Sequence, residues 1–269
     1  MMPTVPGQGL QGHFRCLCPG VCAFQPPGPH NVFPSSASHP PSCDRPLSDG
    51  EVDFLWWFIQ GSIMDADVRS RLDAHWGMCP RHALGFFTVE AAFRPHLIHG
   101  STILYTELMA RAVRILGGGL YGFAPAAIMR RRLQPGGPCH MCSLGYHADS
   151  PGNAPAQRLA QGRDLTNARA FADANRAGWV PHVCGRCAGT GNPSLCRLHL
   201  IESIAHNHGP ELRAHRQTVI DIATHLGRFE HAFRWDSRDT DTNEDRGALV
   251  AAIGWCSGWQ DILQTFGVD

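Results

Sequence analysis

The sequence of 269 residues contains no lysine, so all 23 of its basic side chains are arginines. A Schiff-base lysine, the phosphate-binding lysine of a Walker motif and a Ser-x-x-Lys nucleophile pair are therefore excluded. An excess of charge is also missing, because 23 acidic side chains balance the basic ones. Without a global field to attract phosphates or anionic lipids, we expect neither specific nucleic-acid binding nor membrane binding.

Long apolar runs are missing as well. No window approaches the roughly 18 apolar residues that cross a bilayer, and residues 1–18 lack the charged and apolar regions of a secretion signal. We therefore expect a cytoplasmic protein, in which clustered cysteines are typical of metal or redox sites rather than of disulfides. Sustained alternation of apolar and polar residues is equally absent, which predicts an all-α fold.

Proline and glycine gather near the N-terminus, where residues 1–47 contain ten of the 20 prolines. This composition predicts a mostly disordered leader. Ser48 and Glu51 then form a capping-box pattern, and apolar residues recur at helical spacing beyond them. We predict an irregular helical domain with helices at residues 49–60, 65–77, 80–93, 102–116, 156–176, 193–207, 210–234 and 244–266. Its two halves, residues 48–138 and 139–269, are predicted to be related.

The sequence is rich in side chains that bind metals, with 11 cysteines and 16 histidines. Four pairs of them are separated by two residues, namely Cys79/His82, Cys139/Cys142, Cys184/Cys187 and Cys196/His199. Two ligands at this spacing reach one tetrahedral ion from a single knuckle or helix start. The pairs predict Zn²⁺ as the cofactor, bound as one or two structural ions at helix starts.

The spacing leaves open which pairs share an ion. We favour one closed set that consists of Cys139, Cys142, Cys196 and His199. The pair Cys184/Cys187 then either replaces the Cys-x-x-His of that set or completes a first site beside Cys79 and His82. Each half would thus join a cysteine knuckle to a Cys-x-x-His at the start of a later helix.

The motifs resemble those of a known group of proteins. The segment Gly77-Met78-Cys79-Pro80-Arg81-His82 and the later Ile103-Leu104-Tyr105-Thr106-Glu107-Leu108 are similar to motifs of an uncharacterised bacterial family with paired Cys-x-x-Cys and Gly-Phe-Cys-x-x-His modules. The similarity extends to residues 65–69 and 229–234. Because that family is a domain of unknown function, the resemblance implies a fold type and metal binding without an activity.

One departure from the family concerns the first site. Where its first Cys-x-x-Cys is expected, this chain has only Cys43, after Pro41 and Ser42. Cys43 is therefore a candidate ligand beside Cys79 and His82, and the missing ligand has to come from elsewhere. The candidates are His39, Cys16, Cys18 and Cys22.

Three classes of function fit these residues. We favour a zinc-stabilised structural or interaction module with a protein partner that the sequence does not identify, because closed four-ligand sites leave no place for a substrate. A metal-dependent hydrolase with an open zinc site is one alternative, with Glu90 or Glu107 as the base. A dithiol redox protein that uses Cys139 and Cys142 is another, although the strand-helix setting of thioredoxin-like proteins is missing.

Overall fold

The computed structural model describes residues 45–117, 126–205, 209–238 and 240–267, and for residues 209–214 the backbone alone. Every regular element in these ranges is helical, which confirms the predicted all-α fold. The helices are α1 (Asp49–Phe58), α2 (Ala66–His75), α3 (Pro80–Phe93), α4 (His99–Leu116), α5 (Ala126–Leu133), α6 (His140–Ser143), α7 (Ala156–Gly162), α8 (Thr166–Ala174), α9 (Gly185–Ala188), α10 (Arg197–Ala205), α11 (Gly209–His231), α12 (Asn243–Ser257) and α13 (Gln260–Phe266). Short 3-10 turns lie at Ser62–Met64, Arg176–Gly178 and Val180–His182.

Two helix starts follow local signals in the sequence. Ser48 and Glu51 form the predicted capping box of α1, since the side chain of each accepts a hydrogen bond from the backbone N–H of the other. α3 begins at Pro80 as predicted, because the missing N–H of a proline costs nothing in the first turn of a helix.

The start of α4 depends instead on a contact from another helix. α4 begins at His99, earlier than the predicted residue 102. The buried carboxylate of Glu90 on α3 accepts hydrogen bonds from the backbone N–H of Gly100 at 2.6 Å and of Ser101 at 2.8 Å. Glu90 thereby satisfies donors that a helix start leaves without partners, and no local pattern shows this.

Two predicted helices are each divided in the structure. The stretch 156–176 forms α7 and α8 because Asp164 accepts hydrogen bonds from the backbone N–H and the hydroxyl of Thr166, at 2.9 and 2.6 Å, in a local turn. The stretch 244–266 divides into α12 and α13 at Gly258, whose φ of +106° no helix contains. The chain turns there so that the ring of Trp259 packs directly on Gly254.

The helix α5 lies outside the helix ranges predicted from the sequence. Its buried apolar face is limited to Met129 and Leu133. Two buried residues give little hydrophobic periodicity in the sequence. The helix is therefore recognised only from the structure, where it packs against α10 and α4.

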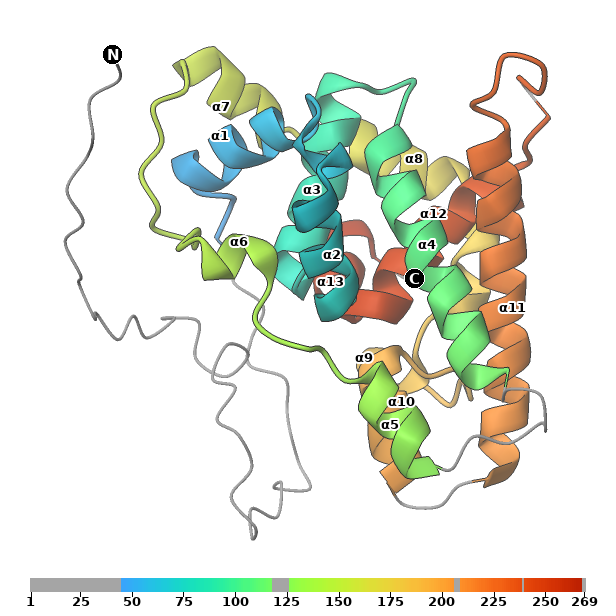
Figure 1. Ribbon diagram of the computed structural model, residues 1–269. Coiled ribbons are helices and arrows are strands. Elements are labelled where there is room, and N and C mark those ends of the chain that lie inside the picture. The colour runs from blue at the N-terminus through green and yellow to red at the C-terminus, as the bar shows by residue number, and fades with distance from the viewer. Residues whose placement is uncertain (1–44, 118–125, 206–208, 239, 268–269) are drawn as a thin grey trace, which may run out of the picture.

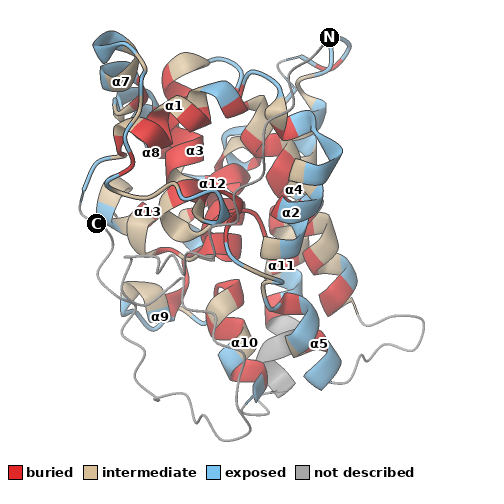
Figure 2. Cartoon of the chain, turned by 60° about the vertical axis from the view of Figure 1, so that its left-hand side comes forward, coloured by how far each residue is buried: buried red, intermediate tan, exposed pale blue. Residues whose placement is uncertain are grey.

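The helices pack around one apolar core. α11 runs along one edge of the molecule beside α4, and α12 packs against both (Figure 1). α1, α7 and α8 pack on α3, whereas α5, α9 and α10 are grouped at the opposite end (Figure 1). Buried residues line the inner faces of these helices (Figure 2), and the largest are Trp76, Trp179, Trp255 and Trp259. Both predicted halves contribute to this cluster, and their relation stays a prediction.

The last three residues of the predicted leader, residues 45–47, contact the helical domain. Arg81 donates hydrogen bonds to the carbonyls of Arg45 and Pro46, both at 2.9 Å, and Arg163 donates to that of Leu47 at 2.7 Å. The remainder of the leader, residues 1–44, lies outside the described residues. In the described ranges no helix has the length and apolar character needed to cross a membrane.

The packing of Trp259 on Gly254 gives a first testable prediction. A Cβ at residue 254 would lie 2.4 Å from the Trp259 ring, so we expect Gly254→Ala to lower the free energy of unfolding by about 1–3 kcal/mol. Gly227 in α11 is the matched control, because a Cβ there meets nothing within 4 Å. Gly227→Ala should raise stability by about 0.5–1 kcal/mol through its higher helix propensity. Thermal unfolding followed by circular dichroism measures both, and equal midpoints for the two variants would contradict the packing argument.

Candidate metal centres

The first centre brings together the side chains of Cys79, His82, Cys139 and Cys142. Cys79 is the residue before α3 and His82 lies in the first turn of that helix. Cys139 precedes α6 in the same way, and Cys142 lies within it. The Nδ1 atom of His82 lies 3.3 Å from Sγ of Cys79 and 3.5 Å from Sγ of each of the other two cysteines, and Cys79 Sγ lies 3.9 Å from Cys142 Sγ.

The second centre repeats this arrangement with Cys184, Cys187, Cys196 and His199. Cys184 precedes α9, and Cys196 precedes α10. The Nδ1 atom of His199 lies 3.2 Å from Sγ of Cys184, 3.5 Å from that of Cys187 and 3.4 Å from that of Cys196. The sulfurs of Cys187 and Cys196 are 3.8 Å apart.

Both groups have the dimensions of a tetrahedral ligand shell. Bonds of about 2.3 Å to sulfur and about 2.0 Å to nitrogen at tetrahedral angles place sulfurs about 3.8 Å apart and sulfur and nitrogen about 3.5 Å apart. The sulfur–sulfur distances of 3.8 and 3.9 Å and the sulfur–nitrogen distances of 3.2 to 3.5 Å agree with this geometry. Each group could therefore hold one metal ion through three thiolates and one imidazole.

The pairing that we favoured from the sequence is wrong. It combined Cys139 and Cys142, which belong to the first centre, with Cys196 and His199, which belong to the second. In the structure, the pair Cys79/His82 joins Cys139/Cys142, and the pair Cys196/His199 joins Cys184/Cys187. Both alternative uses of Cys184 and Cys187 are wrong as well, because these residues join Cys196 and His199. The reason is tertiary packing: α6 packs against α2, whose end leads directly to Cys79.

The remaining ligand candidates belong to the part of the chain outside the described residues. Cys43, His39 and the cysteines at positions 16, 18 and 22 all lie there. The first centre has four ligands without any of them. The role of Cys43 therefore stays a prediction that the four-ligand geometry does not require.

A buried carboxylate supports the first centre, a role that no motif in the sequence indicates. Glu51 is completely buried, and His82 donates its Nε2–H to the Glu51 carboxylate at 3.0 Å, which leaves Nδ1 facing the three sulfurs. Arg81 binds the same carboxylate through two hydrogen bonds of 2.6 Å. Burial raises the pKa of Glu51, but Arg81, His82 and the N–H of Ser48 together hold it well below its usual range. The ionised carboxylate fixes the tautomer and orientation of His82, as second-layer carboxylates do in metal sites.

The ligand side chains have the electrostatics of a cation site. Burial alone lowers the pKa of His199, but the thiols of Cys184 and Cys187 raise it to about 10. Burial also lowers the pKa of His82, but Cys79, Cys139 and Glu51 stabilise the imidazolium and raise this pKa well above its ordinary value. The thiolates attract a divalent cation in the same way, and its charge is twice that of a proton.

The end of α12 connects the two centres. Arg197, which follows the ligand Cys196, is 4% exposed and donates to the carbonyl of Cys256 at 2.9 Å and to that of Leu133 at 2.8 Å. The hydroxyl of Ser257 donates to the carbonyl of Met78, the residue before Cys79, at 3.0 Å. Two neighbouring residues of α12 thus contact residues that lie next to a ligand, Arg197 at the second centre and Met78 at the first.

Arg197 also balances charge. Burial lowers its pKa to about 10, so the guanidinium stays protonated at neutral pH. A divalent ion with three thiolates and a neutral imidazole has one net negative charge, which a neighbouring cation stabilises. The sequence pointed to the ligands beside Arg197 but not to Arg197, because exposed and buried arginines look alike in a sequence.

The two carboxylates considered as catalytic bases lie elsewhere. Glu90 caps α4, and burial raises its pKa. Glu107 forms an ion pair with Arg69. Neither belongs to a metal-ligand group in the described part of the chain.

No protein-family model, curated protein or solved structure matches this chain. The resemblance to the uncharacterised bacterial family therefore stays a prediction. What is known of the site rests on its own geometry.

The contact between Glu51 and His82 gives the second prediction. Glu51→Gln keeps the size of the side chain but removes its charge, so we expect the metal affinity of the first centre to fall about 10- to 100-fold. The second centre should be unchanged. A competition titration with a chromophoric zinc chelator resolves the two equivalents, and only one should shift.

Asp245 provides the matched control. It is the capping-box carboxylate of α12 and lies 2.7 Å from His225, which is not a metal ligand. Asp245→Asn should leave both equivalents at their original affinity. If Glu51→Gln leaves both unshifted too, Glu51 does not position His82.

Proposed function

We propose that this chain is a helical module stabilised by two structural zinc ions, one in each Cys₃His centre, and that it acts by binding a protein partner. The observation that carries the proposal is the convergence of four ligands at tetrahedral spacing in both centres. Zinc is the metal of choice because thiolate and imidazole ligands in a tetrahedral shell suit it, whereas oxygen-binding ions need carboxylates and water.

A structural role follows from the number of ligands. A catalytic zinc site typically has three protein ligands and keeps a fourth position for water or substrate. In both centres the fourth position belongs to a cysteine or histidine of the chain itself. This argues against the open-site hydrolase, and so does the position of Glu90 and Glu107 away from the ligands.

The same geometry argues against a dithiol redox site. A redox pair needs one accessible low-pKa thiol and one resolving thiol at the start of a helix. Burial raises the pKa of Cys139, but hydrogen bonds with Cys142, Cys79 and His82 together hold it well below its usual range, and Cys139 is almost fully buried. Its thiolate is stabilised by the other ligands of one centre, as expected for a thiolate that faces a metal ion.

The ions would stabilise segments that have little structure of their own. α6 and α9 are four residues long, and isolated helices of fewer than about 12 residues are marginal in water. Each has one cysteine of a centre directly before it and a second cysteine of the same centre within it. Metal binding of about 10–16 kcal/mol, as in zinc-finger peptides, is comparable to the whole net stability of a domain.

Exposed aromatic residues support the binding role. Trp57 is 55% exposed and Trp235 is 85% exposed, although tryptophan is normally buried. Tryptophan is also among the residues that contribute most to protein interfaces. The partner itself is not identified by these residues.

The structural role gives the third prediction. Purified protein should contain two zinc equivalents by elemental mass spectrometry, and titration with a strong chelator should remove zinc and helical circular-dichroism signal together. A catalytic ion behaves differently, because its loss leaves most of the fold intact. Release of all zinc with an unchanged spectrum and thermal midpoint would refute the structural role.

The pairing of ligands gives the fourth prediction. We expect Cys79→Ser to remove one zinc equivalent, Cys184→Ser to remove the other, and the double variant to contain none. Cys256 is the matched control, since it is a buried free cysteine outside both groups. Cys256→Ala should keep both equivalents. Loss of both ions in either single variant would show that the centres are not independent four-ligand sites.

A further inference from the structure

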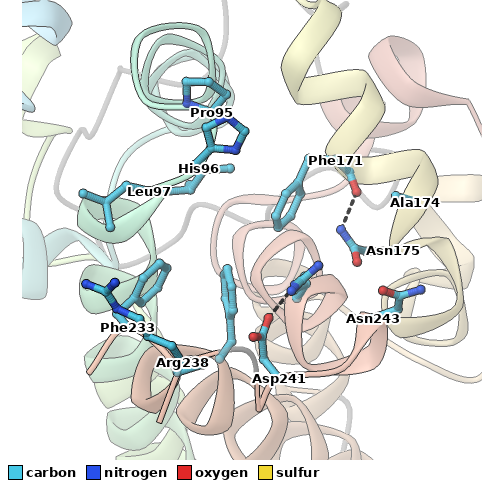
Figure 3. Close-up of a pocket in the computed structure, with 14 residues that line it drawn as sticks. Pro95, His96, Leu97, Phe171, Ala174, Asn175, Phe233, Arg238, Asp241 and Asn243 are labelled. Carbon is cyan, nitrogen blue, oxygen red and sulfur yellow. Dashed lines mark hydrogen bonds and ion pairs between the residues drawn. The ribbon is translucent and has the colours of Figure 1, made fainter. Parts of the chain in front are cut away.

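A pocket with a volume of about 640 Å³ opens where four segments of the chain meet (Figure 3). The segments are residues 95–98 between α3 and α4, the end of α8, the stretch from the last turn of α11 to residue 238, and the start of α12. The size is typical of sites for small organic ligands. No ligand residue of either metal centre lines this pocket.

The pocket is far from the first metal centre. Cys79 and His82 lie at the start of α3, and the pocket residue Pro95 follows the end of the same helix. A helix of 14 residues is about 20 Å long. The pocket is therefore a separate site, and its role does not depend on the metal proposal.

One side of the pocket is aromatic. The ring centroids of Phe171 and Phe229 are 6.1 Å apart, and those of Phe229 and Phe233 are 5.0 Å apart. Phe171 also packs edge-on against Phe87 of α3, with centroids 5.6 Å apart. Because these rings are held by the core, they form a preorganised surface on which a planar apolar group can stack.

A buried polar group on the pocket wall has an acceptor without a hydrogen-bond partner among the described residues. Asn175 is 3% exposed, and its Nδ2 donates to the carbonyl of Phe171 at 2.7 Å. Its Oδ1 has no hydrogen-bond partner in the described part of the chain. Figure 3 shows this oxygen turned away from Phe171 toward Asn243. Since buried acceptors are normally paired, Oδ1 points to a donor supplied from outside the chain.

Among the described residues that line the pocket, the arginines differ in their ion pairs. Arg246 forms an ion pair with Asp241, shown by a dashed line in Figure 3. Arg238 is exposed at the rim and forms no ion pair with an acidic residue among those that the structure describes. A guanidinium in this position is suited to bind a carboxylate through two parallel hydrogen bonds.

From these three features we infer that the pocket binds an aromatic carboxylate that also carries a hydroxyl group. The ring stacks on Phe171, Phe229 and Phe233, the hydroxyl donates to Oδ1 of Asn175, and the carboxylate pairs with Arg238. Aromatic area supplies affinity, whereas the two polar contacts supply selectivity.

Three related probes test each contact by isothermal titration calorimetry on the full chain. 6-Hydroxy-2-naphthoate has all three features, 2-naphthoate lacks the hydroxyl, and 2-naphthol lacks the carboxylate. We expect one saturable site for the first probe with a Kd below about 1 mM, and weaker binding of the other two by about tenfold. Equal affinities for all three, or no saturable binding of the first, would overturn the proposal.

Variants locate the site. Arg238→Gln should weaken both naphthoates about tenfold and leave 2-naphthol unchanged, since only the carboxylate contact is lost. Arg234, an exposed arginine nearby that does not line the pocket, is the matched control, and Arg234→Gln should change nothing. Phe233→Ala should weaken all three probes. Unchanged naphthoate binding in Arg238→Gln, with circular dichroism confirming the fold of each variant, would exclude the pocket as the site.

Discussion

The rest of the structure depends on one constraint: in each of the two centres, three sulfurs and one nitrogen must lie within a few ångströms of one another. Three thiolates this close to one another repel, so the ionised form of each centre needs positive charge between the sulfurs. The fold provides the geometry through helix starts, because each Cys-x-x-His places one ligand before a helix and one in its first turn. The short helices α6 and α9 supply the remaining sulfurs.

Buried charges around the centres follow the same logic. Glu51 combines three roles, because it caps α1, pairs with Arg81 and orients His82. Arg197 is the counterpart at the second centre, where a cation lies beside the thiolates. Both residues also tie helices together across the core, so the chemistry of the ligands and the packing of the fold depend on the same side chains.

The fold and the ligand pairs were largely predictable from the sequence, because each depends on neighbours along the chain. Helical periodicity, the capping box at Ser48 and the two-residue spacing of the ligands are all local signals. What was not predictable depends on distant contacts: which pairs share a centre, the capping of α4 by Glu90, and the packing of Trp259 on Gly254 that separates α12 from α13.

The two centres differ in how far apart their ligands lie along the chain. Cys184 and His199 are separated by 15 positions, whereas Cys79 and Cys142 are separated by 63. Closing the longer loop costs only about 1 kcal/mol more in chain entropy, but it also requires the packing of α2 against α6. We therefore expect the second ligand set to persist as a local chelating peptide in the unfolded chain more readily than the first. Because an ion that also binds the unfolded state stabilises the native state less, we expect the ion proposed for the first centre to contribute more to the folding equilibrium.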